Sequence, residues 1–351
     1  MDEIIAWLLN LIDFHTAADG DDAKACADFI RQVLSVHGVK SQIFSTPGGP
    51  RKAYHLLAEV PGRSPDVVML HAHLDTAGYG EEKDWLFPAG RGTRRRGCVC
   101  GRGAIDCKGP LAVWMKLLSD AAEGPSLPYS LRLLVSDLEE SGGEYGLGRL
   151  LEQHPELLSG LRLVIGEGGG YPFPFREDLF YTFQTGERDP DEEPSCSAVE
   201  PAWEQISAVL AMGIKKGYYS ADVLAYAAQV PFLSGRRLDI RPLYDGMESF
   251  FRKAPVSHVY DRYGKLFEAA LQEALPCARL MPYITPGCSD NRWFRKAGVP
   301  VIGFFPLDIR NSLSGIHGSS EYVSEMSLAL AYRVMSRLLE SLSGISFRQI
   351  M

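Results

Sequence analysis

The chain has 351 residues, of which 46% are hydrophobic, and its formal net charge at pH 7 is −8. This length can fill the cores of two domains, and the acidic balance gives no basic surface of the kind that binds nucleic acid. No run of 18 or more apolar residues occurs, so we expect no membrane-spanning helix and no membrane partner.

The N-terminal part of the chain alternates between helical and extended patterns. Apolar residues at helical spacing predict helices over 2–14 and 21–37, and short β-type runs follow at 40–45 and 54–60. The chain begins Met1-Asp2-Glu3, whereas a secretory signal needs a positively charged start. Seven cysteines are scattered along the chain, which is typical of reduced thiols. We therefore expect a cytoplasmic protein.

The first stretch that carries chemistry runs from Val67 to Thr76. Its apolar start predicts a buried strand, and because side chains alternate along a strand, His73 and Asp75 project to the same side. An imidazole beside a carboxylate suits a metal site, since the carboxylate can fix the ring. A buried histidine held by a turn aspartate explains this stretch alone equally well. His71 shares the same side, and we interpret it as a packing residue.

Acidic residues then recur where further predicted strands end. Asp106 lies in a glycine-rich turn before a helix, Glu139-Glu140 follow a strand over 131–136, and Glu167 follows a strand over 161–166. A lone Glu-Glu pair is better explained by a solvated turn, and Gly-x-Gly alone is weak support for a phosphate site. However, ligands of open α/β sheets bind outside the carboxyl ends of the strands. Four such positions in succession predict a shared metal site.

The remaining histidines outside these motifs have no acidic neighbours in the sequence that would suggest a ligand role. We expect them at the surface or at helix ends: His15, His37, His55, His154 and His258.

These motifs together resemble those of the co-catalytic zinc metallopeptidase and amidohydrolase family. That family includes aminoacylase, acetylornithine deacetylase, succinyl-diaminopimelate desuccinylase, glutamate carboxypeptidase and carboxypeptidase S. The segments that carry the resemblance are His73–Thr76, Gly101–Gly109, Glu139–Gly142, Glu167–Gly169, Thr285–Arg292 and Ile316–Glu321. Cys107 stands where the family usually has methionine.

The resemblance implies a site for two Zn²⁺ ions, for which Co²⁺ or Mn²⁺ are possible chemical substitutes. It implies that His73 and Glu167 bind one ion, that Glu140 and His317 bind the other, and that Asp106 bridges them.

The resemblance also implies the roles of two further acids. Glu139 would take a proton from the attacking water and return it to the leaving nitrogen, and Asp75 would orient the His73 ring. The family further implies a cis peptide bond between Asp106 and Cys107.

The fold class implied is α/β: a mixed-sheet catalytic domain with helices on both faces, formed by residues 1–175 and 283–351. A small α+β lid domain is expected as an insertion over 176–282. This lid departs from the family, because the chain has no histidine between His154 and His258 to stabilise the oxyanion, and an acidic, proline-rich loop stands in its place. We therefore expect a shortened lid, and a monomer or an atypical homodimer.

The predicted function is zinc-dependent hydrolysis of an amide bond in a small N-acyl amino acid or peptide, by a deacylase or an exopeptidase. Arg241 and Arg292 are candidates for binding a substrate carboxylate. The altered lid leaves one alternative, a metal-binding but weakly hydrolytic protein that binds a ligand or partner. The presence of Glu139 speaks against it, because a binding protein needs no general base.

Overall fold

The computed structural model describes residues 1–175, 178–187, 263–285, 288–311, 315–345 and 347. Its helices are α1 (Asp2–Ile12), α2 (Ala23–Val36), η1 (Glu82–Asp84), α3 (Lys108–Glu123), η2 (Glu144–Gly148), α4 (Arg149–Gln153), η3 (Pro155–Leu158), α9 (Lys265–Ala274), α10 (Asn291–Lys296) and α11 (Glu325–Leu342). Its strands are β1 (Lys40–Thr46), β2 (Ala53–Val60), β3 (Val67–His73), β4 (Thr93–Arg95), β5 (Cys98–Cys100), β6 (Ser130–Ser136), β7 (Leu161–Gly166), β8 (Pro172–Phe175), β9 (Asp178–Glu187), β10 (Ala278–Thr285), β11 (Val301–Gly303) and β12 (Tyr322–Ser324).

Within the described residues, the main sheet has nine strands, in the order β1-β2-β6-β3-β7-β11-β9-β10, with β8 paired to β9. Its centre is parallel, because β3 pairs in parallel with both β6 and β7, and β7 with β11. Its other pairings include antiparallel ones, as between β1, β2 and β6 and between β11 and β9. A second, three-stranded sheet has the order β12-β5-β4. The predicted mixed α/β class is confirmed.

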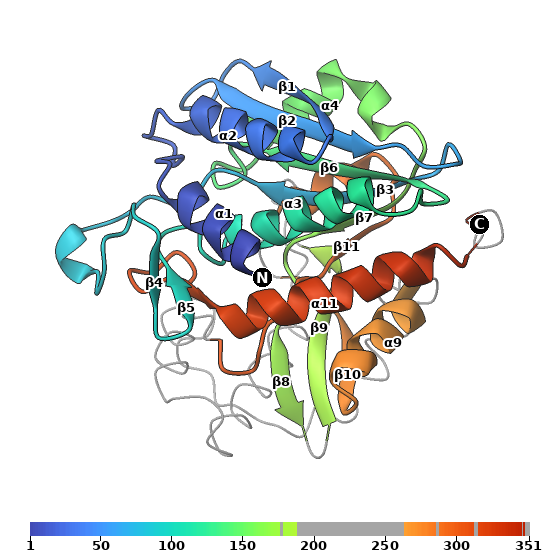
Figure 1. Cartoon of the computed structure of the whole chain (residues 1–351). Helices are drawn as coiled ribbons and strands as arrows, with labels where there is room; N and C mark the ends of the chain where they lie inside the picture. Colours follow the sequence, from blue (N-terminus) through green and yellow to red (C-terminus); the bar gives the residue numbers. More distant parts are fainter. Residues whose placement is uncertain (176–177, 188–262, 286–287, 312–314, 346, 348–351) are drawn as a thin grey trace, which may run out of the picture.

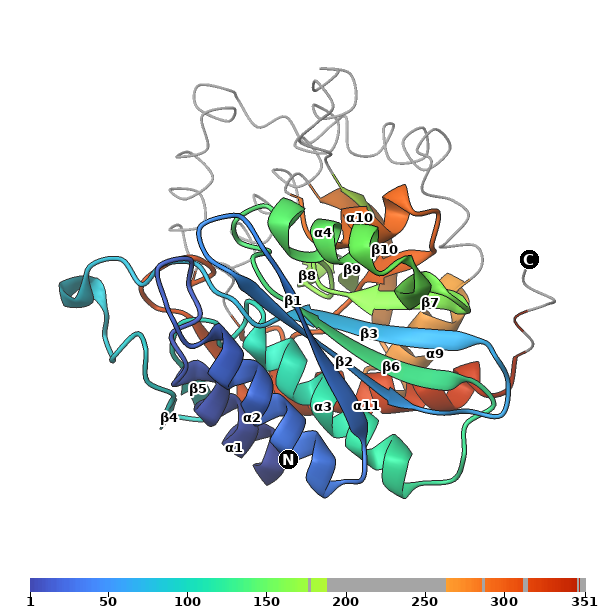
Figure 2. The same ribbon diagram turned by 90° about the horizontal axis from the view of Figure 1, so that it is seen from above.

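Helices cover both faces of the main sheet. Figures 1 and 2 show α1, α2, α3 and α11 on one face of the central strands and α4 with α10 on the other. Successive side chains of β3 pack into two different apolar clusters. Val68 and Leu70 belong to the larger cluster, whereas Val67 and Met69 belong to the smaller one. A strand buried on both faces reads as a continuous apolar run, which is why the sequence predicted it.

The predicted helices and strands of the first 166 residues are present, with ends that differ by a few residues at most. The long helix α11 begins after Ser324, whose Oγ accepts a hydrogen bond from the backbone N–H of Ser327 at 3.0 Å. This serine satisfies one of the free N–H groups of the first helical turn.

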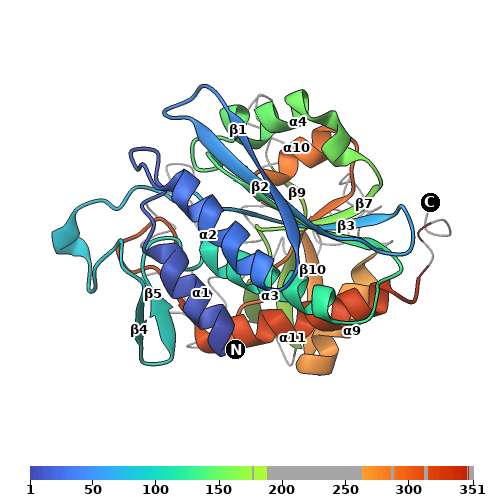
Figure 3. The ribbon, with the colours of Figure 1, turned by 45° about the horizontal axis from the view of Figure 1, so that its top comes forward.

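The segment predicted as a lid lies mostly outside the described residues, which omit 188–262. The strands at its two ends, β9 and β10, pair with each other in parallel within the main sheet (Figure 3). The division at 175 and 283 stays a prediction. Among the helices that the structure describes, none is both long enough and apolar enough to cross a membrane.

The prediction that His55 lies at the surface was wrong. Its side chain is fully buried on β2, because helices cover both faces of the sheet there. Its Nε2–H donates to Thr46 Oγ1 at 3.0 Å, and the Thr46 hydroxyl in turn donates to the carbonyl oxygen of Tyr145 at 2.7 Å. Burial lowers the pKa of His55 to about 3. The ring is therefore neutral in the folded protein at neutral pH.

This burial predicts a loss of stability on acidification. Between the folded pKa of about 3 and an unfolded value of about 6.5, the unfolded chain binds a proton at His55 that the native state does not. The free energy of unfolding should therefore fall with decreasing pH, by up to about 1.4 kcal/mol per pH unit from this group.

Urea denaturation at pH 7 and pH 5 measures this effect. His55→Gln keeps an N–H donor for Thr46 but does not titrate, so its stability should depend less steeply on pH than that of the wild type. Equal slopes for wild type and His55→Gln would contradict the assignment.

Candidate metal centre

Six of the residues predicted for the site meet at one edge of the main sheet. His73 ends β3, Glu139 and Glu140 follow β6, and Glu167 follows β7. Because these three strands are adjacent and parallel, their carboxyl ends lie side by side. Two loops complete the edge: Asp106 directly precedes Cys107 and α3, and His317 lies just before β12.

The side chains form two groups that share Asp106. In the first, His73 Nε2 lies 3.0 Å from Asp106 Oδ1 and 3.4 Å from Glu167 Oε2. In the second, His317 Nε2 lies 3.1 Å from Asp106 Oδ2 and 3.0 Å from Glu140 Oε2. Each oxygen of Asp106 thus faces a different histidine, which is the geometry that a bridging carboxylate requires.

Asp75 contacts both the His73 ring and the turn that carries Glu139 and Glu140. Its backbone carbonyl accepts a hydrogen bond from His73 Nδ1 at 3.0 Å, while its carboxylate Oδ1 lies 3.4 Å from the same nitrogen. The carboxylate also accepts the backbone N–H groups of Glu139 at 3.2 Å and Glu140 at 3.0 Å. Asp75 therefore fixes the ring largely through its main chain and uses its side chain to hold the Glu-Glu turn.

Glu321 has a positioning role that the sequence analysis did not assign. Its carboxylate, which is fully buried, accepts the backbone N–H groups of Gly103 at 3.0 Å, Ile105 at 2.9 Å and Asp106 at 3.1 Å. Arg102 Nη1 donates to the same carboxylate at 2.9 Å. This acid thus fixes the turn that presents Asp106. The only signal in the sequence was an unassigned acid four residues after His317.

Asn291 is a second residue whose role was missed. Its Nδ2 donates to the carbonyl oxygen of Glu167 at 2.9 Å and to Gln184 Oε1 at 2.8 Å. Gly303 allows β11 to approach at the same point, since a Cβ there would lie 1.9 Å from the Glu167 carbonyl oxygen. The backbone that carries Glu167 is therefore held from two sides.

The close approach of these groups shifts their pKa values. Hydrogen bonds to Asp106 and Glu140 raise the pKa of His317 to about 10. Burial alone would lower the pKa of His73, but the charge of Glu167 and hydrogen bonds to Asp106 and Asp75 outweigh it and raise the value. Burial would likewise raise the pKa of Asp106, and the two histidines outweigh it, so that this pKa is lowered. The two imidazoles and the Asp106 carboxylate that lies between them thus interact favourably.

In two other acids, the interaction with His73 does not outweigh the effect of burial. Burial, together with neighbouring carboxylates, raises the pKa of both Glu139 and Glu167. Glu167 Oε1 is buried and has no hydrogen-bond partner among the described residues. A cation at this position would satisfy that oxygen and offset the crowded negative charge. Nitrogen and oxygen donors of these kinds are ligands for Zn²⁺, so the residues present fit the implied ions.

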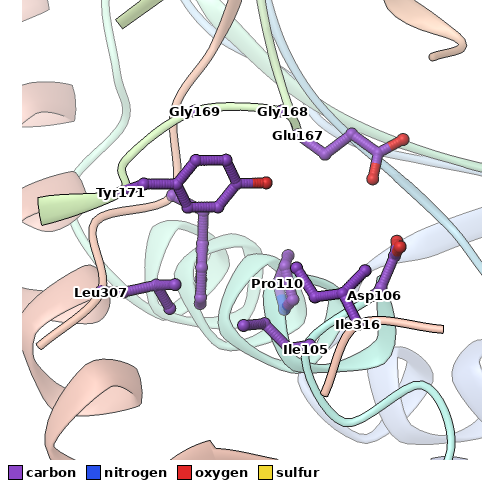
Figure 4. A pocket seen from close by; sticks show the side chains of 10 residues that line it. Ile105, Asp106, Pro110, Glu167, Gly168, Gly169, Tyr171, Leu307 and Ile316 are labelled. Carbon is purple, nitrogen blue, oxygen red and sulfur yellow. The ribbon is translucent and has the colours of Figure 1, made fainter. Parts of the chain in front are cut away.

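A small pocket that is partly open to solvent lies beside the shared aspartate. Its wall contains Asp106 and Glu167 on one side, and its other lining residues are largely apolar: Ile105, Pro110, Gly168, Gly169, Tyr171, Phe305, Leu307 and Ile316. Figure 4 shows the Tyr171 ring across the pocket from Asp106, with its hydroxyl directed toward the side on which the two carboxylates lie.

Two expectations concern residues near this edge. The peptide bond between Asp106 and Cys107 is cis, as the resemblance implied. His71 is fully buried, with Nε2 3.0 Å from Ser136 Oγ and its ring against Phe294, which agrees with a packing role.

The two arginine predictions have different outcomes. Arg292 is buried on α10, its guanidinium lies over the Trp293 ring, and its Nη2 donates to the carbonyl oxygen of Gly142 in the turn after Glu140. Substrate binding by Arg292 stays a prediction. Arg241, like the acidic loop and the rest of the expected lid, lies outside the described residues.

Parts of the chain are similar in sequence to curated proteins. Over 111 residues the chain is 32% identical to a cysteinylglycine-S-conjugate dipeptidase of Corynebacterium striatum, covering 32% of this chain and 24% of that protein. Over 165 residues it is 27% identical to a probable succinyl-diaminopimelate desuccinylase of Staphylococcus epidermidis, covering 46% of this chain and 38% of the relative. These matches span well under half of the relatives' length.

Similarity of fold extends over nearly the whole chain. The crystal structure of an M20 family metallo-carboxypeptidase from Sulfolobus solfataricus superposes with a TM-score of 0.69 at 14% identity, covering 98% of this chain and 100% of the other. Residues 69–341, which include all seven predicted catalytic and metal-binding positions, match the model of peptidase family M20/M25/M40. The chain belongs to the peptidase family M20/M25/M40.

Proposed function

We propose that the protein hydrolyses an amide bond in a small peptide or N-acyl amino acid, with two Zn²⁺ ions at the His73 and His317 groups and Glu139 as the general base. The observation that carries this proposal is the position of Glu139. Its Oε2 lies 3.9 Å from His73 Nε2, at the edge of the first group, yet Glu139 belongs to neither set of potential ligands. A carboxylate beside a metal centre that is not needed as a ligand is free to transfer protons.

The ligands follow from the two groups of side chains. His73 and Glu167 would hold one ion, Glu140 and His317 the other, and Asp106 would bridge them. When bound, such a pair of ions polarises a carbonyl group and makes a water molecule more acidic. Co²⁺ or Mn²⁺ could occupy the same donors.

Glu139 would perform the proton transfers. One of its carboxylate oxygens takes a proton as water attacks the amide carbon, and a C–O bond forms. The same carboxyl then donates that proton to the amide nitrogen as the C–N bond breaks. Burial and the charge of Glu167 raise the pKa of Glu139, which suits a group that must first accept a proton and then give it up.

The pocket indicates which part of the substrate this centre would select. Apolar side chains such as Leu307 and Ile316 line it together with Asp106 and Glu167, so it favours an apolar side chain or acyl group next to the cleaved bond. The relatives named as a dipeptidase and a desuccinylase support cleavage of small amide substrates. Whether the protein acts as a deacylase or an exopeptidase is decided by which substrates it turns over.

The first prediction concerns the general base. Glu139→Gln should lower kcat by about 10²- to 10⁴-fold, because the amide cannot accept the proton, while the metal content stays at two ions per chain. Turnover would be measured on a panel of dipeptides and N-acyl amino acids with added Zn²⁺ or Co²⁺, together with metal analysis of each variant.

Glu144→Gln is the matched control, because Glu144 is exposed in the same loop region and belongs to neither group; it should keep wild-type activity. Undiminished turnover by Glu139→Gln would overturn the assignment of the base. Full metal loading without turnover by the wild type on any substrate would instead favour the ligand-binding alternative.

The second prediction concerns the pocket. Leu307→Ala enlarges it, so kcat/KM for substrates with larger apolar groups should rise relative to smaller ones by about tenfold or more. Leu338→Ala on α11 is the control: both leucines are buried and lose the same atoms, but Leu338 does not line the pocket. Both variants should lose stability, by about 2–5 kcal/mol. An unchanged substrate ratio in Leu307→Ala would show that this pocket does not hold the selected group.

A further inference from the structure

Cys107 places a thiol inside the first group of side chains. Ligand atoms of His73, Asp106, Glu167 and Cys107 all lie within 4.8 Å of one another, so a single ion could contact all four. The Cys107 side chain is 1% exposed. It is the residue at which the sequence departs from the methionine usual in this motif.

We propose that Cys107 is a direct ligand, through its thiolate sulfur, of the ion held by His73 and Glu167. The proposal rests on the metal site of the proposed function. On binding, the Cys107 thiol releases its proton to solvent and a metal–sulfur bond forms, without any change of oxidation state. Thiolates are strong ligands for Zn²⁺, with a Zn–S distance of about 2.3 Å.

The buried position alone does not account for this arrangement. Cys26 is equally buried, on α2, but it belongs to neither of the ligand groups found among the described residues. The charges near Cys26 come from Lys108, Asp137 and Asp22. Cys26 and Cys107 are therefore equally buried, but only Cys107 lies beside the other potential ligands.

A sulfur ligand would make the two metal positions unequal. The His73 position would have four protein donors, the number that fills a tetrahedral zinc site, whereas the other group consists of Asp106, Glu140 and His317. His317 is also the more accessible of the two histidines, with 56% of its side chain exposed against 0% for His73. A soft thiolate would also favour Zn²⁺ or Co²⁺ over Mn²⁺ at the His73 position.

Cobalt substitution tests the proposal directly. The full-length protein would be stripped of metal, titrated with Co²⁺ and followed by absorption spectroscopy, because a thiolate bound to Co²⁺ gives a sulfur-to-metal charge-transfer band in the near ultraviolet. The wild type and Cys26→Ser should both show the band. Cys107→Ser and Cys107→Ala should lose it while still binding Co²⁺ at the His317 side.

A second measurement covers the case in which the variants fold poorly. X-ray absorption at the zinc edge of the wild type alone should reveal a sulfur shell at about 2.3 Å besides the nitrogen and oxygen shell. We also expect Cys107→Ser to weaken Zn²⁺ binding at the first position by about tenfold or more, since even outer partners of a ligand contribute that much.

The outcomes separate this inference from the proposed function. A wild type that binds two ions and hydrolyses amides, but shows neither the charge-transfer band nor the sulfur shell, would overturn the role of Cys107 and leave the proposed function intact. A band that persists in Cys107→Ser would overturn it as well. A wild type that binds no divalent metal would overturn both.

Discussion

The arrangement of this edge of the sheet depends on how buried negative charge is balanced. Six carboxylates converge here, and moving a carboxylate out of water without a partner costs free energy. They belong to Asp75, Asp106, Glu139, Glu140, Glu167 and Glu321. Asp75 and Glu321 are balanced by backbone N–H groups. Asp106 is balanced by two imidazoles. Burial and neighbouring carboxylates raise the pKa values of Glu139 and Glu167, and divalent cations would balance this charge.

The need to balance these buried charges also explains why the residues that hold the ligands in place lie far from them in the sequence. Glu321 holds the turn of Asp106 from 215 positions away, and Asn291 holds the backbone of Glu167 from 124 positions away. The ligands come from strand ends and loops, and each loop needs a fixed backbone if its carboxylate is to face the others. Each of these supports is a hydrogen bond from or to the main chain. The C-terminal part of the chain therefore completes a site that the N-terminal strands begin.

The arrangement also assigns different tasks to neighbouring acids. Adjacent residues Glu139 and Glu140 diverge: Glu140 contacts His317, whereas the carboxylate of Glu139 lies near His73 but outside either ligand group. The turn is held by Asp75 through both backbone N–H groups, which keeps one carboxylate for the metal and the other for proton transfer. With Cys107 as a ligand, the His73 ion would be the more enclosed of the two.

The sequence by itself determined the elements and the order of the motifs, because these depend on local patterns. Alternation in β3 identified His73 and Asp75 as neighbours, the apolar runs identified β6 and β7, and acids at their ends located the edge. The family resemblance added the bridging role of Asp106, the ligand His317 and the cis bond before Cys107. These features arise from periodicity and from short contiguous motifs, both of which are readable without a fold.

Only the tertiary structure decided which side chains balance one another. The burial of His55 follows from helices that cover both faces of β2, and the roles of Glu321 and Asn291 follow from contacts between segments more than a hundred residues apart. That Asp75 fixes His73 largely through its carbonyl, and that the Cys107 thiol joins the ligand group, depends on backbone directions within single turns. No local pattern encodes such contacts, because the free energy of a buried polar group is set by the partners that folding brings to it.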